Sequence, residues 1–97
     1  MIYSKQDVCP ICQQGKVGFR KCANSTSIVL MCDECDSIWL EPNLVEVDNV
    51  IYLEPPDFVI PSLNCSLLNS RWASREEVNR KGWGKYYGGE GKALDES

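Results

Sequence analysis

Four cysteines occur as two close pairs, and their spacing is the clearest chemical signal in the sequence. Cys9 and Cys12 form one Cys-x-x-Cys pair, Cys32 and Cys35 form the other, and 19 residues separate the pairs. Two intervening residues let a tight turn direct both thiolates toward one ion, and the longer segment can form a hairpin that brings the turns together. The spacing predicts one structural Zn²⁺ ion bound by these four cysteines. Iron in a tetrahedral sulfur site fits the same spacing.

The sequence contains no histidine, and this absence narrows the chemistry that the protein can perform. It excludes nucleophiles activated by histidine and catalytic metals bound by histidine. A site of four protein thiolates also leaves no coordination position open for water or substrate. The glycines match no known nucleotide-binding motif. We therefore predict that the protein is not an enzyme and has no small-molecule substrate.

Two further cysteines, Cys22 and Cys65, lie outside the pairs. A disulfide framework requires an oxidising compartment, but Lys5, Gln6 and Asp7 stand where a signal peptide would be apolar. There is also no apolar run long enough to span a membrane. We predict a cytoplasmic protein with reduced thiols. In it, Cys22 is a core or turn residue, or a neighbour of the metal, and Cys65 packs as a small apolar side chain.

Short strands are expected to position the metal ligands. Residues 16–22 alternate loosely between polar and apolar side chains, residues 23–27 form a turn cluster, and residues 28–31 are an apolar, β-branched run. Residues 37–40 follow the second cysteine pair and are predicted to form another strand. The order of strand, turn, strand, cysteine pair and strand predicts a zinc ribbon within residues 1–47.

The segments around the cysteine pairs resemble a known group of proteins. Cys9-Pro10-Ile11-Cys12, the second pair, and the run from Ile38 to Glu41 are similar to small bacterial proteins with a zinc ribbon of the transcription factor IIB type. The match covers about residues 8–47. The resemblance implies the fold and four cysteine ligands, and it implies no particular activity.

The remaining residues, 48–97, are predicted to pack on the ribbon, so that the chain is one small α+β unit. Apolar residues between positions 45 and 53 predict a strand or an irregular extended segment. Ser74 and Glu77 have the spacing of a capping box, which predicts a short helix that ends at Gly82. The glycine-rich run after it is either a closely packed loop or the start of a flexible tail.

The distribution of acidic residues suggests a protein partner. The formal net charge is −4, and residues 41–69 contain five acidic residues and no lysine or arginine. An acidic segment with apolar side chains suits a basic partner, because charge steers the encounter and apolar anchors stabilise the complex. We predict a protein-binding module, most specifically an immunity-type or antitoxin-type inhibitor of a basic, nuclease-like protein. The predicted contact residues are Glu46, Asp48, Tyr52, Glu54, Asp57 and Phe58.

The alternative is a regulator that binds nucleic acid, because basic and aromatic side chains together can track phosphates and stack bases. The net negative charge opposes this function unless the basic residues are strongly segregated. The predicted contacts are Lys16, Phe19, Arg20 and Lys21, joined by Lys81, Trp83, Lys85, Tyr86 and Tyr87. No membrane partner is expected.

Overall fold

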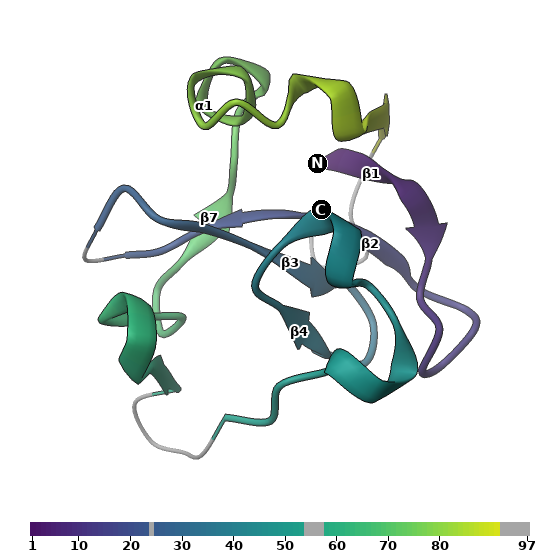
Figure 1. Ribbon diagram of the computed structural model, residues 1–97, viewed down its shortest axis with the longest axis horizontal. Coiled ribbons are helices and arrows are strands. Elements are labelled where there is room, and N and C mark those ends of the chain that lie inside the picture. Colours follow the sequence, from purple (N-terminus) through teal and green to yellow (C-terminus); the bar gives the residue numbers. More distant parts are fainter. Residues whose placement is uncertain (24, 54–57, 92–97) are drawn as a thin grey trace.

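The structure is a computed structural model and describes residues 1–23, 25–53 and 58–91. Its centre is an antiparallel sheet with the strand order β4-β3-β2-β1-β8, and a short strand, β7, also pairs with β2 (Figure 1). A second sheet contains only β5 and β6. The strands of the main sheet are β1 (Ile2–Val8), β2 (Lys16–Lys21), β3 (Ile28–Cys32), β4 (Ile38–Trp39), β7 (Arg71–Trp72) and β8 (Tyr87–Glu90).

The β2–β3 hairpin forms as the sequence predicts. Its register runs without interruption from the pair Val17 and Cys32 to the pair Lys21 and Ile28. The hairpin turn is closed by a hydrogen bond in which the Cys22 amide donates to the Ser27 carbonyl oxygen, at 3.0 Å. Strand β4 then pairs with β3, so the three strands predicted around the cysteine pairs are confirmed.

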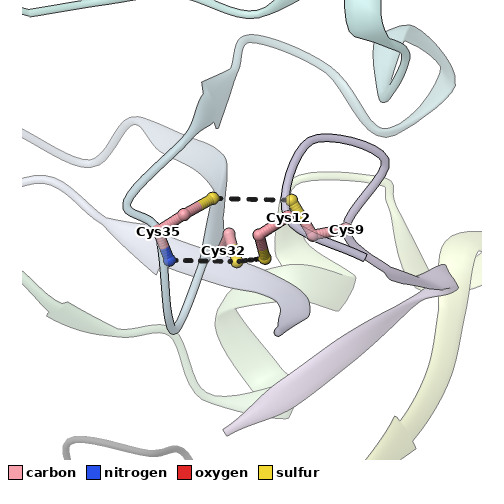
Figure 2. Close-up of side chains that lie close together, drawn as sticks. All are labelled: Cys9, Cys12, Cys32 and Cys35. Atoms are coloured by element: carbon pink, nitrogen blue, oxygen red, sulfur yellow. Dashed lines mark hydrogen bonds between the residues drawn. The ribbon is translucent and has the colours of Figure 1, made fainter. Parts of the chain in front are cut away.

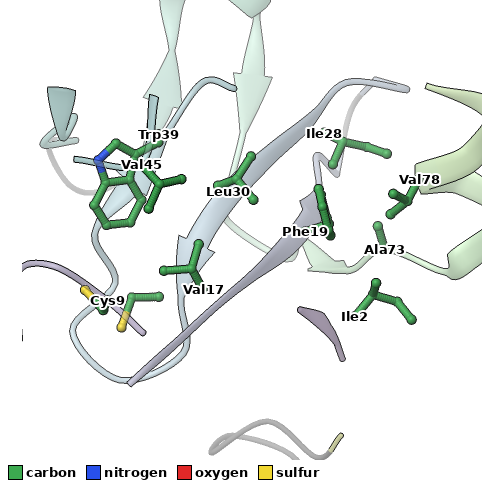
Figure 3. Close-up of a cluster of buried hydrophobic side chains, with 11 residues drawn as sticks. Ile2, Cys9, Val17, Phe19, Ile28, Leu30, Trp39, Val45, Ala73 and Val78 are labelled. Carbon is green, nitrogen blue, oxygen red and sulfur yellow. The ribbon is translucent and has the colours of Figure 1, made fainter. Parts of the chain in front are cut away.

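Alternation of side chains along β2 and β3 creates a separate core on each face of the sheet. Phe19 and Leu30 point to the first face, where they pack with Trp39 (Figure 3). Val29 points to the other face and packs with Ile38. All five side chains are buried, so both faces of the hairpin contribute to a core.

The first core is covered by a short helix, α1 (Arg75–Arg80), and by the turn that follows it. The Ser74 hydroxyl accepts a hydrogen bond from the Glu77 amide, and the Glu77 carboxylate accepts one from the Ser74 amide, so the capping box is present. Val78 is the buried residue of the helix. The helix ends at Arg80 and is capped by Lys81, and Gly82 then turns the chain away with φ at +85°. Trp83 follows and packs with Phe19, with 6.1 Å between ring centroids.

Residues 41–53 turn around Trp39. Of the two structures predicted for residues 45–53, a strand or an irregular extended segment, the strand does not form. Two 3₁₀ turns, Pro42–Leu44 and Val47–Asn49, interrupt the segment, and only Ile51 bridges to β4. The buried Trp39 indole N–H donates to the Glu46 carbonyl oxygen at 2.8 Å. This bond holds the chain as a turn over the indole, because a buried donor must be satisfied.

The second core is closed by β5 (Val59–Ile60), a 3₁₀ turn (Pro61–Leu63) and β6 (Cys65–Ser66). A disulfide joins Cys65 to Cys22, with 5.4 Å between the Cα atoms. Both residues are buried as predicted, but the prediction that all thiols are reduced is wrong for this pair. A cytoplasmic location stays a prediction, and the disulfide counts against its premise, because such bonds are rare in that compartment.

The glycine-rich run is neither a loop nor a tail within the described residues. A 3₁₀ turn, Gly84–Tyr86, leads directly into β8, which pairs with β1 at the edge of the sheet. A Cβ atom at Gly88 would overlap the backbone of Ser4, so glycine lets the two strands approach. The amino terminus of Met1 also donates to the Gly91 carbonyl oxygen at 2.7 Å. The main sheet therefore contains strands from residues 1–47 and from residues 48–97.

Candidate metal centre

Two tight turns hold the four cysteines at one end of the hairpin. The first turn follows β1, and in it the Gln13 amide donates to the Cys9 carbonyl oxygen at 2.9 Å. The second turn follows β3, and in it the Cys32 amide donates to the Ser37 carbonyl oxygen at 2.9 Å. A bond from the Asp33 amide to the Lys16 carbonyl oxygen, at 3.0 Å, joins the second turn to the start of β2. The hairpin therefore brings the two pairs together, as the spacing predicts.

The four sulfur atoms have the separations of a tetrahedral metal site (Figure 2). Zn²⁺ with four thiolates at about 2.3 Å places its sulfurs about 3.8 Å apart, since a tetrahedron's edge is about 1.63 times its centre-to-corner distance. The Cys9 and Cys35 sulfurs are 3.6 Å apart, and those of Cys12 and Cys32 are 3.7 Å apart. All four sulfurs lie within 4.8 Å of one another. The cluster fits a single structural zinc ion, which would link the two turns.

Backbone amides surround the sulfurs and favour their ionised form. The Ile11 amide donates to the Cys9 sulfur at 3.4 Å, and the Gly15 amide donates to the Cys12 sulfur at 3.3 Å. The amides of Glu34 and Cys35 both donate to the Cys32 sulfur at 3.4 Å. Donors that point at sulfur stabilise a thiolate, which is the form that binds zinc.

Burial and hydrogen bonding shift the thiol pKa values in opposite directions. Burial raises the pKa of Cys9 and of Cys32. The backbone amides of Gly15 and then Gln14 lower the pKa of Cys12 to about 7. A buried thiol that resists ionisation is deprotonated when a cation coordinates it, because the ion supplies the largest local charge. Zinc binding at this site would therefore displace the protons of the two buried thiols.

The centre is closed on one side and reaches the surface on the other. Cys9 and Cys32 are buried, Cys12 is partly exposed, and Cys35 is exposed. Gly15 packs directly on the cluster, since a Cβ atom there would lie 2.5 Å from the Cys32 sulfur. With Zn²⁺ bound, four thiolates would give the centre a net charge of about −2, and the exposed Cys35 would present part of it at the surface.

An apolar groove with a volume of about 360 Å³ adjoins the exposed side of the centre. Cys35 and Asp36 contribute to its lining, and no described lining residue is basic. Two of the lining side chains protrude, since Tyr52 is 78% exposed and Leu68 is 50% exposed. The remaining lining residues are Met31, Ser37, Ile38, Ile51, Leu53, Phe58, Leu67 and Asn69.

The residues predicted to bind a protein partner are only partly brought together. Tyr52 and Phe58 both line the groove, on segments that are separated in the sequence. Glu46 and Asp48 are exposed around the second 3₁₀ turn and do not line the groove. Glu54 and Asp57, also predicted, lie outside the described residues. Sequence reasoning missed Leu68 and Asp36, because only the fold shows that Leu68 is exposed and that Asp36 lies beside the groove.

The residues predicted to bind nucleic acid need one correction. Phe19 is completely buried in the first core, because it points inward from β2, and it cannot contact a nucleic acid. Lys16 lies over the Tyr3 ring, with its Nζ 4.8 Å from the ring centroid, and the guanidinium of Arg20 lies 4.6 Å from the centroid of the Trp72 ring.

The other predicted basic and aromatic residues lie near the helix. The Nζ atoms of Lys81 and Lys85 lie 5.3 and 5.2 Å from the ring centroids of Trp83 and Tyr86. Tyr87 at the start of β8 has the guanidinium of Arg75 over its ring. Such cation–π contacts leave the positive charges near the surface while they restrict the side chains.

Charge is strongly segregated along the chain. Residues 1–21 and 71–91 contain nine basic and four acidic residues, whereas residues 22–70 contain eight acidic residues and no basic one. The two basic-rich segments meet in the sheet, because β1 pairs with β2 and β8, and β2 pairs with β7 (Figure 1). Together with residues 92–97, which contain one basic and two acidic residues, these segments give the net charge of −4.

Comparison with known proteins gives one related sequence. The chain is 22% identical over 89 residues to a protein of Acanthamoeba polyphaga mimivirus described as uncharacterized, and the match covers 81% of this chain and 72% of the viral protein. No protein-family model matches the chain. No solved structure matches it either. Among the described residues, no helix has the length and apolar character needed to cross a membrane.

Proposed function

We propose that this small metal-binding protein is a non-enzymatic module that binds another protein through the apolar groove beside its metal centre. The observation that carries the proposal is the exposure of large apolar side chains along one groove, since contiguous exposed apolar surface marks interaction sites. Tyr52 and Leu68 supply the most exposed of these side chains. Aromatic anchors in a pocket are typical of the residues that dominate binding energy.

The charge around the groove favours a basic partner. Asp36 lines the groove, the exposed Cys35 carries part of the thiolate charge, and no described lining residue is basic. A partner that inserts an apolar side chain next to a lysine or arginine would satisfy both features. The specific form of the proposal is inhibition of a nuclease-like protein in the manner of an immunity protein or antitoxin, because nucleases present basic surfaces to their substrates.

A pair of neighbouring residues allows a sharp test of the groove. Phe58 and Val59 are each 38% exposed, but only Phe58 lines the groove. The original protein and the variants Phe58→Ser and Val59→Ser, all zinc-loaded, should be immobilised in parallel and exposed to the same cell lysate. The proteins that each of them retains are then quantified by mass spectrometry. We expect a basic protein that is retained by the original chain and Val59→Ser, lost with Phe58→Ser, and inhibited as a nuclease by the original chain. Equal retention by both variants would contradict the proposal.

Nucleic-acid binding is a second candidate, and the segregation of charge favours it. The basic residues on and beside β2 support this candidate, since Lys16 and Arg20 both lie over aromatic rings. The affinity for a labelled single-stranded oligonucleotide should then fall steeply as the salt concentration rises. It should fall more steeply than the affinity of the groove for its protein partner. Absence of binding at low salt would remove this candidate.

A further inference from the structure

A second cleft, separate from the groove, lies between the β2–β3 turn and the end of α1. Its volume is about 300 Å³. The residues that line it share no member with the groove and come from two segments that are more than forty positions apart. They are Lys21, Thr26, Ser27, Ile28, Glu77, Arg80 and Lys81.

The cleft is positively charged, because its single carboxylate is already neutralised. Both oxygens of Glu77 accept hydrogen bonds from the Arg71 guanidinium, at 2.8 and 2.7 Å, and one of them also accepts the Ser74 amide at 2.9 Å. Arg71 does not line the cleft. The positive charges of Lys21, Arg80 and Lys81 therefore have no full counter-charge inside it.

Two of the three cations are held in place before any ligand binds. Lys21 Nζ donates to the carbonyl oxygens of Cys22 and Ser25, at 3.3 and 3.1 Å. Lys81 lies over the Trp83 ring. Side chains that are already restricted lose less conformational entropy on binding, so such a site gains affinity.

The third cation can move toward a ligand at little cost. Arg80 pairs with Glu76 at 2.9 Å, but the side chains are 73% and 79% exposed. An exposed ion pair one helical turn apart contributes little to stability. A guanidinium offers two parallel donors that match the oxygens of an oxyanion. If Arg80 leaves Glu76 for such a ligand, a weak ion pair is replaced by a stronger one.

We propose that this cleft binds a phosphate group. Two ammonium groups, one guanidinium, and the hydroxyls of Thr26 and Ser27 suit a ligand with three terminal oxygens and a charge near −2 better than a carboxylate. Phosphate is the chemistry shared by two sources: a phosphomonoester, which has both properties, and the backbone of a single-stranded nucleic acid, whose phosphodiester has two terminal oxygens and a charge of −1. The site depends neither on the metal centre nor on the groove.

The test uses zinc-loaded full-length protein and follows backbone amide NMR signals at constant ionic strength. Inorganic phosphate, a nucleoside monophosphate and a single-stranded oligonucleotide are titrated separately. We expect saturable shifts at the amides of Thr26, Ser27 and Lys81. Affinity should be at least tenfold weaker in Arg80→Gln and Lys81→Gln, both of which change exposed side chains.

The matched control is Arg75→Gln, because Arg75 is an exposed cation on the same helix that lies over Tyr87 and outside the cleft. Its affinity should stay within twofold of the original. If the oligonucleotide binds at least tenfold more tightly than the monophosphate, with the same dependence on Arg80 and Lys81, the phosphate that the cleft binds belongs to a nucleic acid. Equal affinities for the two ligands indicate a free phosphomonoester. Absence of saturable shifts, or equal losses in Arg75→Gln and Lys81→Gln, would overturn the proposal.

Discussion

Removal of the Cys22–Cys65 disulfide should destabilise the protein by up to about 4 kcal/mol. The two residues are 43 positions apart, and a cross-link over a loop of that length lowers the entropy of the unfolded chain by about 13 cal/mol/K. This corresponds to about 4 kcal/mol at 25 °C, which is a large share of the 5–15 kcal/mol typical of small domains. The bond also ties the β5–β6 segment to the hairpin, so its loss should loosen the groove wall that carries Phe58.

The assay compares thermal unfolding of the original protein with that of the double variant Cys22→Ala/Cys65→Ala, both zinc-saturated and without reductant. For a domain of this size, we expect the midpoint to fall on the order of 20 °C. Thiol titration of the unfolded, metal-free original protein should detect four thiols, which are the free cysteines of the metal centre. Detection of all six thiols, or a loss of stability below about 1 kcal/mol, would refute the reasoning.

Two further predictions concern the helix cap and the metal centre. The hydrogen bonds from Arg71 hold the pKa of Glu77 well below its ordinary value, at about 2. The pair therefore stabilises the fold fully above pH 4.5, and this stabilisation is lost as the pH falls toward 2. Glu77→Gln should lower the free energy of unfolding in urea by about 1 kcal/mol at pH 7 and by less at pH 3. Glu76→Gln, which breaks a largely exposed pair, should lower it by about 0.3 kcal/mol. Equal losses in the two variants would contradict this account. Gly15→Ala should weaken zinc binding at least tenfold in a competition assay with a chelator, because its methyl group would meet the Cys32 sulfur. Gly82→Ala, at a positive φ with open space around it, should lower stability by about 1 kcal/mol and leave zinc affinity unchanged.

The parts of the fold that could be predicted from the sequence are those set by local patterns. The spacing of Cys9, Cys12, Cys32 and Cys35 encodes two tight turns on one hairpin, and the sulfur positions follow from that hairpin. The capping box likewise involves only residues 74–77, whose hydrogen bonds form within one helical turn.

The parts that could not be predicted depend on contacts between distant segments. The turn around Trp39 arises because a buried indole needs an acceptor, and nothing in residues 45–53 marks Glu46 as that acceptor. Strand β8 was obscured by its glycines, which usually indicate a loop, but here Gly88 permits close pairing with β1. The disulfide has one signal in the sequence. Once four cysteines bind a metal, Cys22 and Cys65 are the two that remain to pair.

The central claim is that one metal ion bound by four thiolates holds the two turns together. X-ray absorption at the zinc edge, combined with metal analysis of the purified protein, tests it most directly. We predict one zinc per chain with four sulfur neighbours at about 2.3 Å, and loss of the β2–β3 hairpin signals when a chelator removes the ion. Nitrogen or oxygen ligands in the first coordination sphere, or full thermal stability of the metal-free protein with its disulfide intact, would contradict the claim.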